Sequence, residues 1–563
     1  MAAPPMGRLQ PRSVQDAARL AASIGRAGGR DGAAFGRVYR FSSGDAVCAL
    51  APELAAKYSM EAENRQGVIC VTNRWTADQT WWNPARTLKP QTFKAAAGRV
   101  RPEDLDGTRS RPGGCDFCRW PAMTARDAGF GRVELPGAVT ASNLFKCAEP
   151  CHGVVLFRHH DPLSFDRRQL GDLLDAAWRW LELSEEREGG ARGGGGGNGG
   201  CGEGGAGGLH PFLLWNCLPR AGASQFHGHA QVLLTREPLP QQIHFQNAAA
   251  AYAAAAGNAA LPWPAAAGTD EGALAAGGAA PGQPAPGRGG PASASAASLG
   301  AGSAAGSGCE SDVASPGDDL YVDLLRAHRA LGLLRQVTLG NAGGEAGGAS
   351  SSSSSSLSSS EGGYGGGDGG WEPGSAWAFV SLAPRKDCEV VVVGAHPGCA
   401  AFQSLLHAAL RALIDRLGVA TFNVGLLNLD VRAPHPHAAR LEARELRAGD
   451  GDGNGGDGGG GDGDPLPRAV ALPLEALWVP GERGGGGGGD GAPPTGAAAR
   501  RRRRRGARPV VARVVARGSL DSAASDFGGL EVLGGASIGH TDPYAVVAAL
   551  DAQLAALGGP DCC

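Results

Sequence analysis

Residues 215–234 read WNCLPRAGASQFHGHAQVLL and place three hydrogen-bonding side chains at alternating positions. The small residues 221–224 predict a turn, and His227, His229 and Gln231 then lead into an apolar run typical of a strand. Because residues two apart in a strand share a face, both imidazoles and the amide line one side. A purely structural strand would have to find a buried partner for each of them, so the pattern favours a functional site.

This strand resembles the H-x-H-x-Q signature of the galactose-1-phosphate uridylyltransferase family, the transferase branch of the histidine-triad superfamily. Histidine-triad hydrolases carry a third histidine where this chain has Gln231. The family also has an asparagine eight residues before a serine, and the serine lies three residues before the first histidine. Asn216 and Ser224 hold those places here.

The resemblance implies a role for each of these residues. His229 would be the nucleophile that takes up a nucleoside monophosphate, and a neutral imidazole is suited to attack phosphorus at neutral pH. Gln231 would donate a hydrogen bond to the phosphate oxygens, Ser224 would contact the phosphates, and Asn216 would orient His229. Glutamine in place of a third histidine removes a titratable acid near the leaving group, which favours a waiting intermediate over rapid hydrolysis.

Cys115 and Cys118 form a C-x-x-C pair, CDFC, which can chelate one metal ion through thiolates. The family resemblance implies a structural Cys2His2 zinc site. Its other ligands would be His227 and one histidine of RHHD, either His160, which is favoured, or His159. Such a site would fix the N-terminal segment against the nucleophile strand.

A competing arrangement would combine the CDFC pair with Cys147, Cys151 and His152 in a separate zinc ribbon. The C-x3-C spacing, with a proline inside it, makes this arrangement weaker. Upstream, NPARTLKPQTF resembles a short basic segment of the family. Arg86 and Lys89 match the two cations that approach nucleotide phosphates there.

The two halves of the chain repeat one pattern. Apolar β runs at 153–157 and 389–393 are each followed by helical spacing of apolar residues, starting at Leu170 and Phe402, and then by a further β run. We therefore predict an α+β fold of two histidine-triad-like halves, each an antiparallel sheet with a packed helix.

Glycine makes up 93 of the 563 residues, more than twice the usual share of about 7%. The excess lies in low-complexity tracts that we predict to be disordered insertions: 188–208, 248–317, 340–370, 449–464 and 481–508. The predicted domains are an N-terminal extension (1–60), the first half (61–247), a mostly low-complexity linker (248–370) and the second half (371–563).

The composition of the chain bears on its partners and on its location in the cell. A net charge of −3 and a pI near 6.5 provide no basic field for nucleic acid, and the arginine run 500–505 sits in a glycine-rich tract typical of a solvated loop. The sequence has no long apolar segment for a membrane and no signal peptide. Thirteen irregularly spaced cysteines indicate free or metal-bound thiols. A cytoplasmic protein is expected, with organelle import as an alternative because the N-terminus is rich in arginine and alanine.

The resemblance implies a nucleotidyltransferase of the UDP-glucose:hexose-1-phosphate uridylyltransferase type, as in galactose metabolism. Its partners would be a nucleotide sugar and a sugar phosphate, and the family suggests a homodimer. A second hypothesis is an ADP-glucose or diadenosine polyphosphate phosphorylase or adenylyltransferase of the same fold. A third, of another class, is a non-catalytic zinc-stabilised protein that binds nucleotides or RNA.

Overall fold

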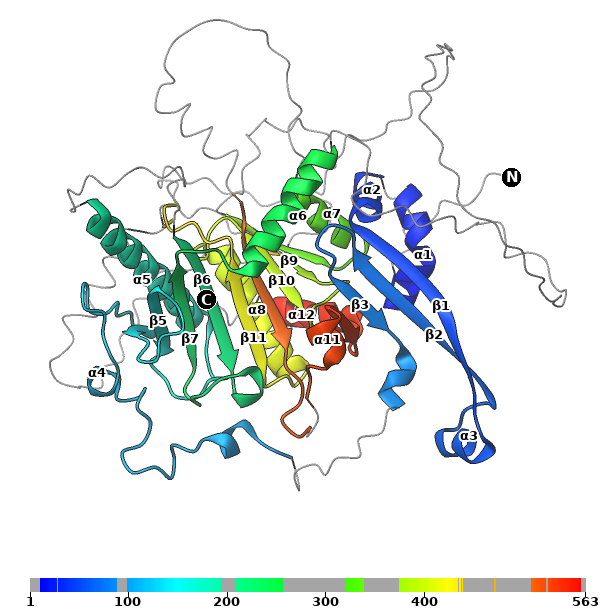
Figure 1. The fold of residues 1–563 in the computed structure, drawn as a ribbon, viewed down its shortest axis with the longest axis horizontal. Coiled ribbons are helices and arrows are strands. Elements are labelled where there is room, and N and C mark those ends of the chain that lie inside the picture. The colour runs from blue at the N-terminus through cyan, green and yellow to red at the C-terminus, as the bar shows by residue number, and fades with distance from the viewer. Residues whose placement is uncertain are drawn as a thin grey trace, which may run out of the picture.

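The computed structural model describes residues 11–27, 29–88, 99–193, 209–256, 319–338, 374–433, 435–436, 438, 470–471, 508–522 and 525–557. It has two sheets with helices packed around them (Figure 1). This arrangement confirms the predicted α+β class. Lys89 and the arginine run 500–505 lie outside the described residues.

The larger sheet has ten strands, and all of its pairings are antiparallel. In spatial order they are β12 (Val470–Ala471), β8 (Leu334–Thr338), β9 (Ser375–Val380), β10 (Val390–Gly394), β13 (Val510–Ala516), β11 (Phe422–Leu427), β6 (His210–Cys217), β7 (His229–Thr235), β5 (Pro150–Phe157) and β4 (Ala138–Ser142). The two halves of the chain therefore share one continuous sheet, which joins where β6 pairs with β11.

The predicted repeat is present in this sheet. The first half runs β4-β5-α5-β6-β7 with α5 at Arg167–Gly193, and the second runs β9-β10-α8-β11-β13 with α8 at Ala400–Arg411. The spatial orders β4-β5-β7-β6 and β9-β10-β13-β11 mirror each other across the central pair. There Asn216 lies opposite Asn423. The two halves are thus related by an approximate twofold axis between β6 and β11.

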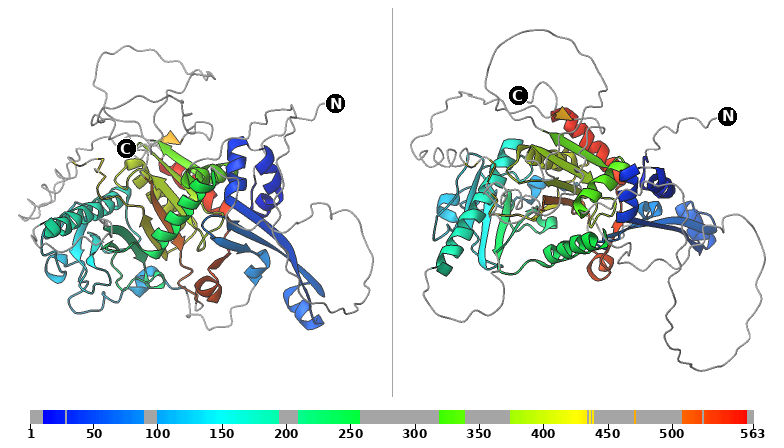
Figure 2. Two further views of the ribbon diagram at one scale, coloured as in Figure 1. Left: turned by 45° about the horizontal axis from the view of Figure 1, so that its top comes forward. Right: turned by 90° about the horizontal axis from the view of Figure 1, so that it is seen from above.

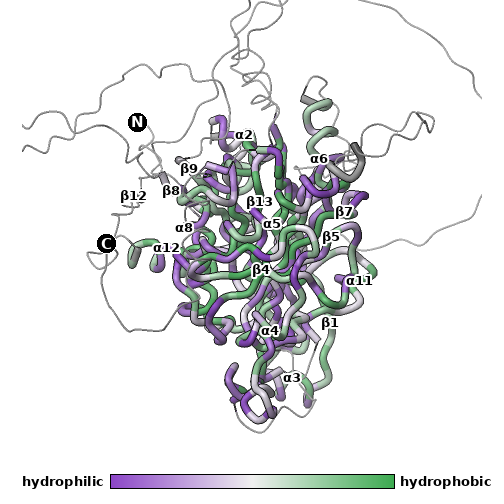
Figure 3. Tube along the Cα trace, turned by 90° about the vertical axis from the view of Figure 1, so that its left-hand side faces the viewer, coloured by the Kyte–Doolittle hydropathy of each residue, from purple (hydrophilic) through white to green (hydrophobic). Residues whose placement is uncertain are grey.

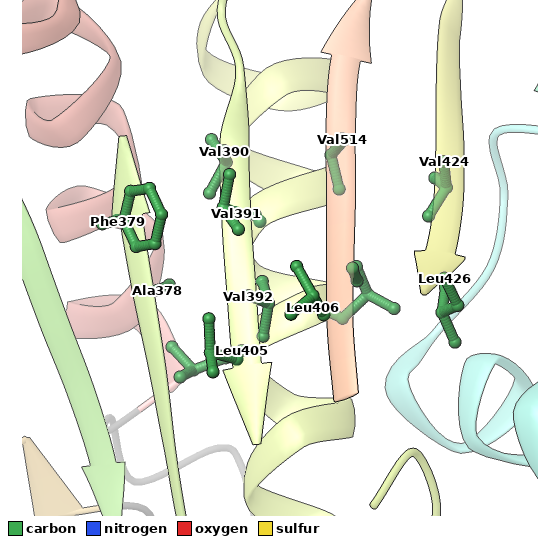
Figure 4. Packing of buried hydrophobic residues seen from close by; sticks show 14 of the residues in the cluster. Ala378, Phe379, Val390, Val391, Val392, Leu405, Leu406, Val424, Leu426 and Val514 are labelled. Carbon is green, nitrogen blue, oxygen red and sulfur yellow. The ribbon is translucent and has the colours of Figure 1, made fainter. Parts of the chain in front are cut away.

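Helices α5 and α8 cover one face of the large sheet. In the second half, Leu405 and Leu406 of α8 pack over the valines of β10 and β13 (Figure 4). In the first half, a Cβ added at Gly153 would lie 2.6 Å from the Trp180 ring of α5, so this approach requires glycine. Hydrophobic segments, green in Figure 3, gather in the body of the molecule.

The smaller sheet has the order β1-β2-β3-β14. Its strands are β1 (Tyr39–Ala49), β2 (Glu63–Asn73), β3 (Gln79–Trp82) and β14 (Ala536–Gly539), the last of which runs parallel to β3. The β1–β2 hairpin crosses the predicted boundary at residue 60. With helices α1 (Val14–Ala27) and α2 (Gly29–Val38), it lies at the opposite end of the molecule from α5 (Figure 2).

The predicted linker 248–370 contains a helix and a strand. Helix α7 (Leu320–Ala330) and β8 extend the fold, because Leu320, Leu324 and Leu331 supply an apolar face within an otherwise low-complexity stretch. The remaining elements are α3 (Pro52–Tyr58), η1 (Pro84–Leu88), η2 (Pro102–Leu105), α4 (Trp120–Met123), η3 (Pro219–Ala221), α6 (Pro240–Ala256), η4 (Ala412–Arg416), α11 (Gly529–Leu533) and α12 (Pro543–Leu557). Among the helices in the described ranges, none is both long and apolar enough to cross a bilayer.

Candidate active site and metal cluster

His229 begins strand β7 and is held in one tautomer by the backbone. Its Nδ1 lies 2.8 Å from the carbonyl oxygen of His227. A carbonyl only accepts hydrogen bonds, so Nδ1 carries the proton and Nε2 carries the lone pair of the neutral ring. Within the described part of the chain, Nε2 makes no hydrogen bond. The ring is 7% exposed, and burial lowers its pKa.

His229 and Gln231 lie on the face of the sheet that α5 does not cover. Val232 lies directly opposite Gly153, the residue that contacts Trp180 of α5. Val232 therefore faces the helix. Because faces alternate along a strand, residues 229 and 231 point to the other side.

The side chain of Gln231 is oriented by a histidine on the neighbouring strand. The backbone N–H of Cys147 donates to His152 Nδ1 at 3.1 Å, which leaves the proton of that ring on Nε2. His152 Nε2 then donates to Gln231 Oε1 at 2.9 Å. With its oxygen engaged, Gln231 has its amide N–H groups left to donate.

Asn216 lies on β6, beside the nucleophile strand. Leu214 is opposite Gln231 in the last pair that β6 forms with β7, and Asn216 follows two residues later on the same face of the sheet as Leu214. On the other side of β6, Asn423 of β11 lies directly opposite Asn216 and donates from Nδ2 to its Oδ1 at 2.7 Å. In the described part of the chain no hydrogen bond joins Asn216 to His229, so the orienting role of Asn216 stays a prediction.

A tight turn joins β6 to β7. The backbone N–H groups of Ala221 and Ala223 both donate to the Leu218 carbonyl, at 3.1 and 3.2 Å. Leu218 has φ 68° and Gly222 has φ 94°, so a leucine holds a left-handed conformation next to the candidate site. Ser224 follows the turn and is exposed, as a phosphate contact requires.

Of the two cations predicted to approach phosphate, the structure describes Arg86 alone. Arg86 lies in η1, directly after β3 of the smaller sheet, and in the described part of the chain no contact joins it to β7. Lys89 cannot be placed, because it lies outside the described residues. The phosphate role of both cations therefore stays a prediction.

Four metal-binding side chains gather beside β7. Their ligand atoms lie within 4.8 Å of one another: Cys115, Cys118, His160 and His227. Nδ1 of His227 lies 3.6 Å from the Cys115 sulfur and 3.4 Å from the Cys118 sulfur, and Nδ1 of His160 lies 3.3 Å from the Cys118 sulfur. The predicted residues thus converge, and His160 is the one from RHHD that joins them. His159 stacks on Phe157 instead, with ring centroids 4.9 Å apart.

The chemistry of this cluster fits a metal ion. His160 donates from Nε2 to Asp106 Oδ2 at 3.0 Å, and His227 donates from Nε2 to the Phe157 carbonyl at 2.7 Å. Both rings therefore turn an unprotonated Nδ1 toward the cysteines, as metal-bound histidines do when their other ring nitrogen donates to a carboxylate or a backbone carbonyl. Two thiols and two imidazoles make a closed tetrahedral set of the kind that zinc prefers. Burial and the neighbouring Cys115 raise the pKa of Cys118 to about 11, so a cation is needed to hold its thiolate.

The CDFC segment also covers His229. The Phe117 ring meets the rings of His227 and His229 edge-on, with centroids 5.8 and 5.2 Å away. Phe117 and Trp120 pack on a small apolar cluster of β4 and β5: Val139, Ala141, Val154 and Leu156. The cluster of ligands thus fixes one wall of the site around His229.

The competing zinc ribbon does not assemble. The Cys147 sulfur lies 3.6 Å from His152 Nδ1, but the Cys151 sulfur lies 3.0 Å from the guanidinium of Arg187. The positively charged guanidinium of Arg187 would repel a metal ion bound to the Cys151 sulfur. Over the described ranges, the Cys115 cluster is the one group with metal-site spacing.

Comparisons with known proteins give matches to solved structures alone. No protein-family model and no curated protein matches the chain. An ADP-glucose phosphorylase from Arabidopsis thaliana with bound ADP-glucose aligns at 10% identity and a TM-score of 0.40, covering 86% of this chain and 97% of that one. A GalT-like protein from Arabidopsis thaliana aligns at 10% identity and a TM-score of 0.37, covering 86% and 98%.

A uridylyltransferase structure aligns at 11% identity and a TM-score of 0.36, covering 86% of this chain and 98% of that one. These neighbours are galactose-1-phosphate uridylyltransferase-like proteins.

Proposed function

We propose that the protein is a nucleotidyltransferase that forms a covalent intermediate on His229. The observation that carries this proposal is the ring of His229, whose Nδ1 proton is held by the His227 carbonyl at 2.8 Å while Nε2 keeps its lone pair. That tautomer is the one a nucleophilic imidazole needs.

In the first step, the Nε2 lone pair attacks the α-phosphorus of a nucleoside diphosphate sugar. A nitrogen–phosphorus bond forms, and the bond from phosphorus to the bridging oxygen breaks. The electron pair leaves on the sugar phosphate. The positive charge that develops on the ring is stabilised by the hydrogen bond from Nδ1 to the His227 carbonyl.

In the second step, a phosphate oxygen of the acceptor attacks the same phosphorus, and the bond to Nε2 breaks with its electron pair returning to the ring. Gln231, with its oxygen held by His152, would donate an amide N–H to the phosphoryl oxygens in both steps. A metal ion on Cys115, Cys118, His160 and His227 would be structural, and we propose zinc.

We propose UDP-glucose as the donor and a hexose 1-phosphate as the acceptor. The experiment incubates the purified chain with UDP-glucose or ADP-glucose labelled at the α-phosphate, followed by denaturing gel electrophoresis. We expect acid-labile, base-stable label from UDP-glucose in the wild type and none in His229→Asn.

The matched control is His210→Asn, on β6 at the far end of the same strand pair, which keeps the label. Label from ADP-glucose alone would reassign the base and retain the mechanism. Label that persists in His229→Asn, or a folded, zinc-loaded wild type that takes label from neither donor, would overturn the proposal. A non-catalytic nucleotide-binding protein would give the latter result.

A further inference from the structure

A chain of polar side chains connects the second half of the molecule to Asn216. Arg517, just after β13, donates from Nε to Asp526 Oδ2 at 2.7 Å and from Nη1 to Asn423 Oδ1 at 2.6 Å. Asn423 donates from Nδ2 to Asn216 Oδ1 at 2.7 Å. The hydrogen bonds therefore run from Asp526 through Arg517 and Asn423 to Asn216.

The arginine fixes the direction of both amides. A guanidinium has donors and no acceptor, so the oxygen of Asn423 must face Arg517. The Nδ2 group of Asn423 is then directed at Asn216, whose oxygen must accept. Asn216 consequently presents its own N–H groups on the open face, beside the start of β7.

Asn423 also fixes the turn before the nucleophile strand. Its Nδ2 donates to the Ala221 carbonyl at 2.8 Å as well as to Asn216. One side chain of the second half thus ties together the end of β6 and the turn that leads to β7. Arg220 of the same turn donates to the Ser522 carbonyl at 2.7 Å.

The position of Arg517 is itself well determined. Its side chain is 21% exposed and that of Asp526 is 14% exposed, so their ion pair is partly shielded from solvent. The guanidinium also lies 5.5 Å from the centre of the Phe527 ring, and Lys386 donates to the backbone carbonyl of Asp526.

We propose that Arg517 is a positioning residue for the nucleophile strand, which acts through Asn423 on Asn216 and on the turn at Ala221. This inference rests on the function proposed above. Arg517 follows β13 and its backbone N–H donates to the Thr421 carbonyl at 2.9 Å, which holds it next to the start of β11. The half without a histidine strand would thus support the geometry of the half that has one.

The test compares Arg517→Met with the wild type in single-turnover formation of the labelled adduct at saturating UDP-glucose, together with the Kd of the donor and the melting temperature. We expect the rate of adduct formation to fall by about tenfold, because a misplaced Asn216 and turn lower the fraction of productive geometry. The Kd and the melting temperature stay close to wild type. Arg517→Lys, which keeps a donor toward Asn423, recovers most of the rate.

The matched control is Arg335→Met. Arg335 on β8 is also 21% exposed and also pairs with an aspartate, Asp551, but it lies near the far edge of the sheet. We expect Arg335→Met to form the adduct at the wild-type rate. If Arg517→Met melts well below the wild type, the near-isosteric Asn423→Asp is measured in its place, and the same rate loss is expected because its carboxylate cannot donate to Asn216.

The outcomes separate this inference from the proposed function. A wild type that forms no adduct contradicts the function itself. A wild type that forms adduct while Arg517→Met and Asn423→Asp form it at the wild-type rate overturns the positioning role and leaves the function standing. The same holds if Arg335→Met slows adduct formation as much as Arg517→Met does, because the effect is then a general loss of stability.

Discussion

Replacing Gln231 by glutamate tests whether its side chain donates to phosphate. The two side chains have nearly the same shape, but the carboxylate carries a negative charge and has no N–H donors. Gln231→Glu keeps an oxygen for the hydrogen bond from His152, now 2.9 Å long, but replaces the amide donors with a negative charge facing the bound phosphates. We expect kcat/KM to fall by about 100-fold, which corresponds to about 2.7 kcal/mol of lost transition-state stabilisation. Steady-state kinetics with UDP-glucose measure this loss.

Gln336→Glu provides the control at the same scale. Gln336 is half-buried on β8 and donates to Thr338 at 3.2 Å, so it tests the cost of adding a carboxylate to a strand of this sheet. It should leave kcat/KM unchanged. A Gln231→Glu protein with wild-type kinetics would show that the amide of residue 231 does not face the reacting phosphate.

The sequence predicted the residues of the site better than their partners. Alternation along one strand was enough to put His229 and Gln231 on one face, and the resemblance supplied the set of four residues that includes Cys115. His152 and Asn423 were missed as partners because their contacts depend on the register between strands. Sequence spacing along a single strand carries no information about that register.

At the scale of elements, the CDFC segment gives a test of the metal cluster. Cys118→Ser removes one thiolate from a four-ligand set. We expect the bound zinc to fall from one per chain to well below one by elemental analysis. The free energy of unfolding should drop by about 3 kcal/mol at a free zinc concentration 100 times the wild-type Kd. The fluorescence of Trp120 should change as well, because its segment packs on β4 and β5.

Cys48→Ser is the control for this element. Cys48 is an exposed thiol on β1 of the smaller sheet, so its replacement should leave zinc content and stability unchanged. Cobalt offers a second readout, since a tetrahedral site with two thiolates gives intense visible absorption that Cys118→Ser should weaken. Equal zinc content in the two variants would argue against metal binding by the cluster.

At the scale of the whole molecule, buried charges hold the two sheets together in a way that the sequence did not indicate. Asp78, in the turn between β2 and β3, accepts from Arg385 at 2.7 Å and lies 3.7 Å from the guanidinium of Arg513 on β13. Each half was expected to form its own sheet, whereas β6 and β11 merge them. Apolar periodicity predicts that a strand forms and which face it buries. The choice of neighbour depends on contacts between residues far apart in the sequence, such as the hydrogen bond from Asn423 to Asn216 across β11 and β6.

A buried histidine between the sheets predicts how the molecule responds to acid. His328 of α7 donates from Nδ1 to the Leu324 carbonyl at 2.7 Å, and its Nε2 lies 3.3 Å from the hydroxyl of Tyr39 on β1. Its ring also stacks on Phe379 of β9, with centroids 4.0 Å apart. Burial lowers the pKa of His328 to about 4, while an unfolded histidine titrates near 6.5.

Below pH 6.5 the unfolded chain binds a proton at this position that the folded chain does not bind. Stability is therefore fully present above about pH 6.5 and falls as the pH drops toward 4, by up to about 3 kcal/mol in total. His328→Gln has no titratable ring at this position. Between pH 6.5 and 4.5 its free energy of unfolding, measured by urea titration, should therefore fall less steeply than that of the wild type, with a difference in slope of about 1.4 kcal/mol per pH unit. His210→Gln, at a half-exposed position, should keep the wild-type slope. If the free energy of unfolding has the same pH dependence in wild type and His328→Gln, the prediction is wrong, because folded His328 then binds a proton as readily as unfolded His328 does.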